Sequence, residues 1–134
     1  MTRKKSKNAH YVNNQEFSEN IVEYVKTVNS ARDAKKDLPI VPNYLAKCFL
    51  NIAENLSHKS NFIRYTYREE MVMDAVENCL KAVENYNIDA ITRTGKPNAF
   101  AYFTQIIWYA FLRRIAKEKK QQEIKEKYLS QSGI

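Results

Sequence analysis

The residues best suited to chemistry lie between positions 98 and 120, where aromatic side chains give way to cations. The aromatic residues include Tyr102, Phe103, Trp108 and Tyr109, and the cations that follow include Arg113, Arg114 and Lys117. Aromatic faces stack on unpaired bases, and Lys and Arg neutralise phosphates. A helix with both features could hold separated DNA strands, and the alternative is that the aromatic residues lie in the core and the cations form a solvated tail.

Motifs that would indicate an enzyme are not found in the sequence. We find no Gly-rich phosphate loop, no nucleophile elbow and no paired-histidine motif. His10 and His58 are far apart, and neither has a Cys or His neighbour at metal-ligand spacing. Cys48 and Cys79 fall in apolar helical patterns and are expected to be buried thiols. We therefore expect no catalytic activity, no metal and no cofactor.

The charge balance favours a polyanionic partner. The chain carries a net charge of +7 and has a sequence pI near 9.4, which suits nucleic acid or an anionic membrane surface. The most apolar stretch, 99–112, is shorter than the roughly 20 residues that span a bilayer. We therefore expect nucleic acid, and no membrane, as the partner.

The elements that position these residues are expected to be helices. The 134 residues include only two Gly and three Pro, too few for a turn-rich β fold. Apolar residues recur at three- and four-residue steps. We predict an all-α fold, a compact domain of about four helices. The predicted helices cover 13–30, 43–58, 66–86 and 98–128, with Asn13 and Asn98 as caps and Thr66 with Glu69 as a capping box.

The predicted domain is preceded and followed by short segments. We expect 1–12 to be a flexible basic arm, 13–128 to be the helical domain and 129–134 to be a short C-terminal tail. The segment 87–97 is predicted to be a basic loop between the last two helices.

The third predicted helix has an acidic face opposite its apolar stripe. That face is either a solvated surface or a docking face for a basic partner helix, because charges in this arrangement steer association and fix register. The last helix is apolar on more sides than one core can cover. We expect Phe100, Phe103, Ile107 and Phe111 in the core, and leave Tyr102, Trp108 and Tyr109 open between the core and a partner.

Two segments resemble a known family. The segment EEMVMDAVENCLKAVENYN, residues 69–87, resembles the polymerase-binding helix of bacterial sigma factors, and AFAYFTQIIWYAFLRRIAKEKK, residues 99–120, looks like the promoter-reading helix that follows it. The match is closer to the late-transcription sigma factors of large tailed, T-even-like bacteriophages. Residues 11–14, 61–62, 65–66, 70–71, 101–102, 104–105, 110–111 and 114–115 also fit that pattern.

The resemblance implies a sigma region 2-like fold and a role for each helix. The acidic helix would dock on the clamp helices of the largest subunit of the host core RNA polymerase. The next loop and helix would read and melt a −10-like promoter element. The implied polymerase-binding residues are Glu70, Met73, Asp74, Glu77 and Lys81, with Met73 in place of the family's Gln. The implied DNA-binding residues are Arg93, Thr94, Lys96, Asn98, Tyr102, Phe103, Ile106, Ile107, Tyr109, Arg113, Arg114 and Lys117.

Some features depart from housekeeping sigma factors. Ile106 and Ile107 stand near the usual Trp pair, and the single Trp is Trp108. No helix-turn-helix segment for an upstream element is seen, so either recognition is confined to the −10 region or a separate coactivator is a further partner. The replication sliding clamp is another, although the final residues, YLSQSGI, lack the acidic group of the family's clamp-binding tail.

The resulting prediction is a phage-type sigma factor that acts in the host bacterial cytoplasm on AT-rich late promoters. Two alternatives stay open: a non-specific basic nucleic-acid-binding protein, and an inhibitor that binds host polymerase. The sigma hypothesis also requires that the acidic face and the basic half of the last helix form separate surfaces that do not point into each other.

Overall fold

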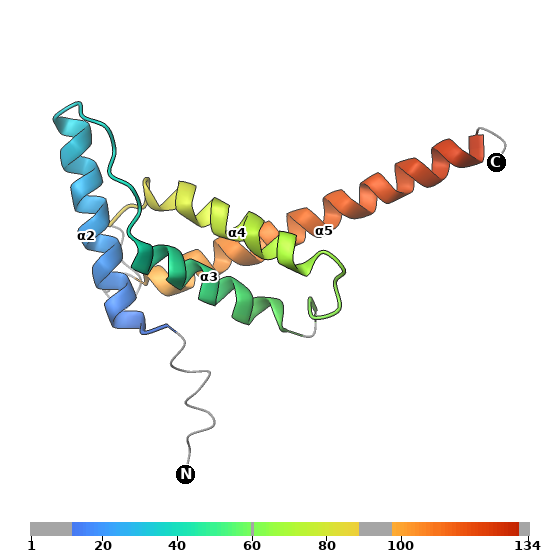
Figure 1. The fold of residues 1–134 in the computed structure, drawn as a ribbon, viewed down its shortest axis with the longest axis horizontal. Helices are drawn as coiled ribbons and strands as arrows, with labels where there is room; N and C mark the ends of the chain where they lie inside the picture. Colours follow the sequence, from blue (N-terminus) through green and yellow to red (C-terminus); the bar gives the residue numbers. More distant parts are fainter. Residues whose placement is uncertain (1–11, 60, 89–97, 132–134) are drawn as a thin grey trace, which may run out of the picture.

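The computed structural model describes residues 12–59, 61–88 and 98–131, and over these residues the fold is all-helical with four helices (Figure 1). They are α2 (Asn14–Asp33), α3 (Asn43–Ser57), α4 (Arg68–Val83) and α5 (Ala99–Gln131). The predicted all-α class and the compact domain of about four helices are confirmed.

The four helices form a compact body from which one end of α5 projects. Figure 1 shows α3, α4 and the first half of α5 lying side by side, with α2 across one end. At 1.5 Å per residue, the 33 residues of α5 span about 50 Å. Every residue from Lys119 to Gln131 is exposed, because no other helix reaches that end.

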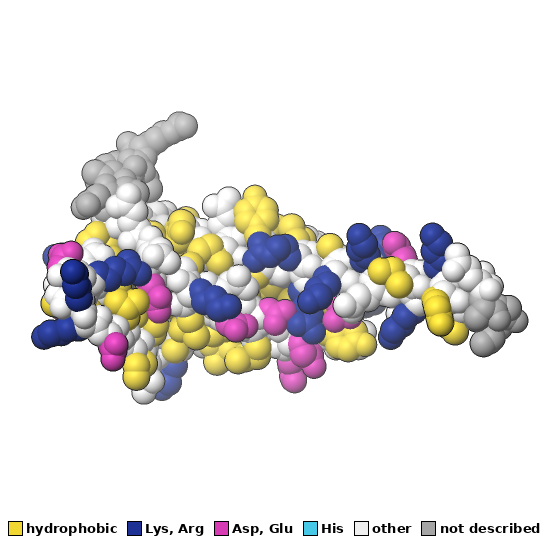
Figure 2. Space-filling view, turned by 90° about the horizontal axis from the view of Figure 1, so that it is seen from above, with side chains coloured by type: hydrophobic (Ala, Val, Ile, Leu, Met, Phe, Trp, Pro, Cys, Tyr) yellow, Lys and Arg dark blue, Asp and Glu magenta, His cyan; other side chains and the backbone are white. Residues whose placement is uncertain are grey.

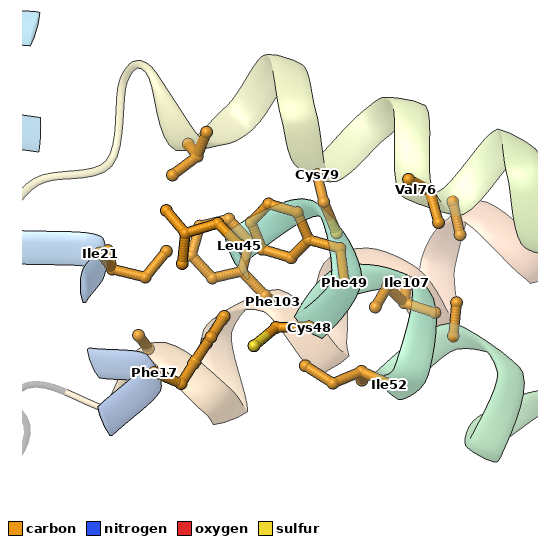
Figure 3. Close-up of a cluster of buried hydrophobic side chains, with 14 of the residues drawn as sticks. Phe17, Ile21, Leu45, Cys48, Phe49, Ile52, Val76, Cys79, Phe103 and Ile107 are labelled. Carbon is orange, nitrogen blue, oxygen red and sulfur yellow. The ribbon is translucent and has the colours of Figure 1, made fainter. Parts of the chain in front are cut away.

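Three phenylalanines from three helices meet at the centre of the core (Figure 3). The ring of Phe17 from α2 lies 5.9 Å from that of Phe49 and 6.0 Å from that of Phe103, both edge-on. The rings of Phe49 from α3 and Phe103 from α5 are 5.0 Å apart. All three side chains are fully buried, so this cluster fixes the position of the first half of α5.

The predicted caps are correct for two helices and wrong for one. The Asn13 side chain accepts a hydrogen bond from the Glu16 amide at 2.9 Å, and that of Asn98 accepts one from the Ala101 amide at 3.0 Å. The Thr66 capping box does not form, and α4 begins two residues later, at Arg68, without a side-chain cap. Phe62, in the segment between α3 and α4, is buried in the core. The residues around it form turns that extend to Tyr67, so α4 begins only after them.

The helix ends differ from the prediction by a few residues. The helix α2 continues past residue 30 to Asp33, and α5 continues past residue 128 to Gln131. After α2, Lys35 adopts a left-handed conformation with φ of 56°. The amide of Lys35 donates to the Arg32 carbonyl and that of Lys36 donates to the Ala31 carbonyl, which is the Schellman arrangement.

The predicted boundaries of the flanking segments shift in the same way. Val12 was assigned to the basic arm, but its side chain is 7% exposed and packs in the core. Residues 129–131 were assigned to the tail, but they belong to α5. The rest of the arm and of the tail lie outside the described residues.

Both cysteines are buried free thiols, as predicted. Burial raises the pKa of Cys79 to about 12, so this thiol stays protonated and acts as a small apolar group. Among the described helices, none combines the length and the apolar character that crossing a bilayer requires.

Candidate functional site

The outer face of α4 carries the predicted docking residues Glu70, Met73, Asp74, Glu77 and Lys81. Its opposite side is buried through Met71, Val72, Ala75, Val76, Cys79 and Val83. On the outer face, Met73 is 58% exposed, and the Glu77 carboxylate lies 3.8 Å from the Lys81 ammonium with both side chains largely exposed. The helix α4 therefore presents one acidic stripe with an exposed apolar residue in it.

The outward side of α5 carries a stripe of aromatic residues followed by cations. Tyr102, Ile106, Tyr109, Arg113 and Lys117 follow one another at steps of four, three, four and four residues, which keeps them on one side of a helix. Tyr102 is 42% and Tyr109 is 50% exposed, whereas Ile106 is partly buried against the core. We call these five residues the α5 outer stripe.

The stripe continues beyond the residues that the sequence predicted. Lys120, Ile124 and Lys127 follow at steps of three, four and three residues, and Ile124 is 57% exposed. Figure 2 shows basic side chains beside apolar ones on the projecting end of α5. The same three- and four-residue spacing was present in the sequence and could have identified the two lysines.

The resemblance implied DNA contacts for two residues that the helical pattern placed in the core, and the core assignment is the correct one. Phe103 and Ile107 are both fully buried, because α2, α3 and α4 cover this side of α5. The ring of Phe103 packs edge-on against that of its neighbour Tyr102, at 5.0 Å. These two residues therefore position the exposed tyrosines and do not themselves face a partner. Trp108 is partly buried, with its ring 5.1 Å from that of Phe62.

The predicted base-reading loop can be placed only at its end. Arg93, Thr94 and Lys96 lie outside the described residues. Asn98 is exposed, and its side-chain oxygen caps α5. The structure therefore gives Asn98 a role in starting α5.

An ion pair between Asp74 and Arg114 joins α4 to α5. The two helices run antiparallel (Figure 1), and a guanidinium nitrogen of Arg114 lies 2.6 Å from a carboxylate oxygen of Asp74. The Nε of Arg114 donates to Glu118 at 3.3 Å. Only 23% of the Arg114 side chain is exposed, against 40% for Asp74. At this point the acidic face and the basic half of α5 do point into each other, so the expected separation of the two surfaces is wrong here.

Among the described residues, no other ion pair joins the acidic face of α4 to the basic half of α5. Arg113 is exposed and donates to the Asn78 side chain at 3.3 Å, and Lys117 is exposed. These residues line a groove of about 840 Å³ between α4 and α5, together with Asp74, Glu77, Ala110, Arg114, Ala116, Glu118, Lys120 and Gln121.

The electrostatics around Arg114 agree with this geometry. The hydrogen bond to Asp74 is the main cause that raises the pKa of Arg114, with Glu118 adding to it. Burial raises the pKa of the nearby Tyr65 hydroxyl, Glu118 raises it further, and Arg114 opposes both effects. Glu118 is not among the predicted site residues, although its position four residues after Arg114 on a helix could have indicated the pair.

No model of a known protein family matches the chain, and no curated protein matches it at a significant level.

Proposed function

We propose that this protein is a phage-type sigma factor, an adaptor that docks on a host core RNA polymerase and directs it to an AT-rich, −10-like promoter element. The single observation that supports this most is that two adjacent helices carry exposed stripes of different character, which meet at the Asp74–Arg114 pair and at no other ion pair among the described residues. The outer face of α4 is acidic, and the α5 outer stripe is aromatic and then basic. The resemblance of residues 69–87 and 99–120 to the two sigma helices points to the same assignment.

In this proposal the outer face of α4 binds the clamp helices of the largest polymerase subunit. Glu70 and Glu77 supply exposed negative charge for a basic partner, and Met73 supplies an apolar contact between them. An interface with a small apolar centre and charges around it gains orientation from the charges and affinity from the buried centre.

The α5 outer stripe binds the opened promoter. Tyr102 and Tyr109 stack on unpaired bases, each contributing about 1–3 kcal/mol, and Arg113 and Lys117 hold phosphates on the duplex side. Capturing unstacked bases costs a few kcal/mol per base, and AT-rich sequence opens at the lowest cost.

In this proposal the protein catalyses no covalent step, and its place of action is the cytoplasm of the host bacterium. A coactivator and the sliding clamp are further proposed partners.

A gel-shift experiment with and without core polymerase tests the proposal. We expect weak binding to an AT-rich promoter duplex by the protein alone and a stable complex when core polymerase is added. A protein that shifts the duplex equally well in both cases, with no supershifted complex, would falsify it.

Non-specific binding to nucleic acid is the second candidate, and the projecting end of α5 favours it. Lys119, Lys120, Lys125 and Lys127 are exposed there. A non-specific binder should bind tightly as the free protein and lose affinity steeply as salt is raised. The same gel shift, repeated across salt concentrations, therefore distinguishes it from a sigma factor.

A further inference from the structure

The arrangement around Arg114 couples the two proposed binding surfaces. Arg114 lies on the basic half of α5, but two of its nitrogens donate to carboxylates: Nη1 to Asp74 and Nε to Glu118. Its neighbour Arg113 and the next cation, Lys117, have no carboxylate within ion-pair distance among the described residues. Arg114 is therefore the cation of the basic half whose charge is satisfied within the protein.

Asp74 belongs to the other surface. It lies on the outer face of α4 between Glu70 and Glu77, and 40% of its side chain stays exposed. A cation of a docking partner can reach it without any movement of the helices. The same carboxylate is therefore available to two competing cations, one inside the protein and one from a partner.

We propose that Asp74 and Glu118 hold Arg114 in an autoinhibitory contact, and that a basic partner on the outer face of α4 releases Arg114 to bind a DNA phosphate. The inference rests on the proposed function, and it names how the two surfaces of that function communicate.

The physical basis is competition for one guanidinium. In the free protein a phosphate that approaches Arg114 meets the negative charges of Asp74 and Glu118, and it must displace one of them. When a partner cation neutralises Asp74, the stronger of the two competitors and its share of the repulsion are removed, and Glu118 alone, at 3.3 Å, still contacts Arg114. Because such coupling is reciprocal, DNA bound at Arg114 equally exposes Asp74 to the partner. The pair is only partly exposed, 23% for the Arg114 side chain and 40% for that of Asp74, so opening it turns both side chains toward solvent and leaves the buried residues of α4 and α5 in place.

The test uses the full-length protein without polymerase and a fluorescein-labelled AT-rich duplex. Anisotropy titrations across roughly 50 to 200 mM salt give the slope of log K against log salt, which steepens by about 0.9 for each added phosphate contact. We expect Asp74→Asn to bind more tightly at low salt and to steepen the slope by about 0.9. Asp74→Asn in an Arg114→Ala background should leave the slope of Arg114→Ala unchanged.

Glu69→Gln is the matched control. Glu69 is an exposed residue in the first turn of α4 that belongs to neither proposed surface, and its replacement removes the same single charge. It should leave the slope at the wild-type value. Equal slopes for Asp74→Asn and Glu69→Gln would overturn the proposal, as would a steepened slope that persists without Arg114. Circular dichroism confirms that each variant is folded.

The result is separable from that of the proposed function. If the slopes behave as expected but core polymerase forms no complex with the protein, the contact is real and the sigma role is wrong. If polymerase binds and Asp74→Asn leaves the slope unchanged, the sigma role stands and the autoinhibitory contact is wrong.

Discussion

Tyr102 and Phe103 are adjacent in the sequence and have opposite environments. Tyr102 is 42% exposed on the α5 outer stripe, whereas Phe103 is fully buried among Phe17 and Phe49. Both residues are aromatic and both were predicted to contact DNA. Their separation into a partner-facing and a core residue gives a direct test at the scale of the single residue.

Phe103→Ala should lower the free energy of unfolding by about 3–5 kcal/mol, because it leaves a cavity at the centre of the core. Tyr102→Ala should lower it by about 1 kcal/mol, a typical loss for a single substitution. Urea denaturation followed by circular dichroism measures both. Losses of equal size would show that Tyr102 is a core residue and would remove it from the proposed DNA surface.

Glu70→Lys should weaken binding to core polymerase at least tenfold, which corresponds to about 1.4 kcal/mol, because it reverses an exposed charge on the proposed docking face. Asp74→Lys is a less specific test, since it also breaks the pair with Arg114. Glu23→Lys, an exposed position on α2, is the matched control with the same charge change. Pull-down with purified polymerase measures the loss, and similar weakening by both variants would contradict the assigned face.

At the scale of the helix, the end of α2 carries a residue in an unfavourable conformation. Lys35 has a positive φ of 56°, which costs a residue with a Cβ roughly 1–2 kcal/mol and costs glycine little. Lys35→Gly should therefore raise the free energy of unfolding by up to about 1 kcal/mol, part of the gain being offset by the greater freedom of glycine in the unfolded chain.

Lys36→Gly is the control for this prediction. The substitution removes the same charge, and the amide of Lys36 takes part in the same Schellman arrangement. Lys36 is not among the described residues with positive φ. It should leave stability unchanged or lower it in thermal denaturation. A stabilisation by Lys36→Gly equal to that by Lys35→Gly would indicate a charge effect and not relief of the backbone.

The helices themselves could be predicted from apolar periodicity and caps, and the details that failed have specific causes. Asn13 and Asn98 cap their helices because their side chains act locally. The predicted start of α4 was wrong because the turns between α3 and α4 end only after Phe62 has been placed in the core. The burial of Phe62 depends on residues far away in the sequence. The pairing of Asp74 with Arg114, which are 40 residues apart, depends on the antiparallel register of α4 and α5, and periodicity within one helix cannot supply that register.

At the scale of the whole molecule, Arg113 and Lys117 should supply phosphate contacts in the complex of this protein, polymerase and promoter. Replacing both with Ala should flatten the slope of log K against log salt by about 1.8, since each contact contributes about 0.9. Replacing Lys26 and Lys47, which are exposed on α2 and α3, removes the same charge and should leave the slope unchanged. Filter binding of promoter DNA to the assembled complex measures it, and equal slopes for the two double variants would contradict the assignment.

We propose that this protein turns a core polymerase into one that initiates at an AT-rich late promoter. Run-off transcription with purified bacterial core polymerase, this protein and a template that carries such a promoter measures this directly. We expect a discrete transcript that appears only when the protein is added and that is lost with Glu70→Lys. No transcript, or a decrease in transcription that the core enzyme with its own sigma factor supports, would contradict the claim and would favour an inhibitor of the host polymerase.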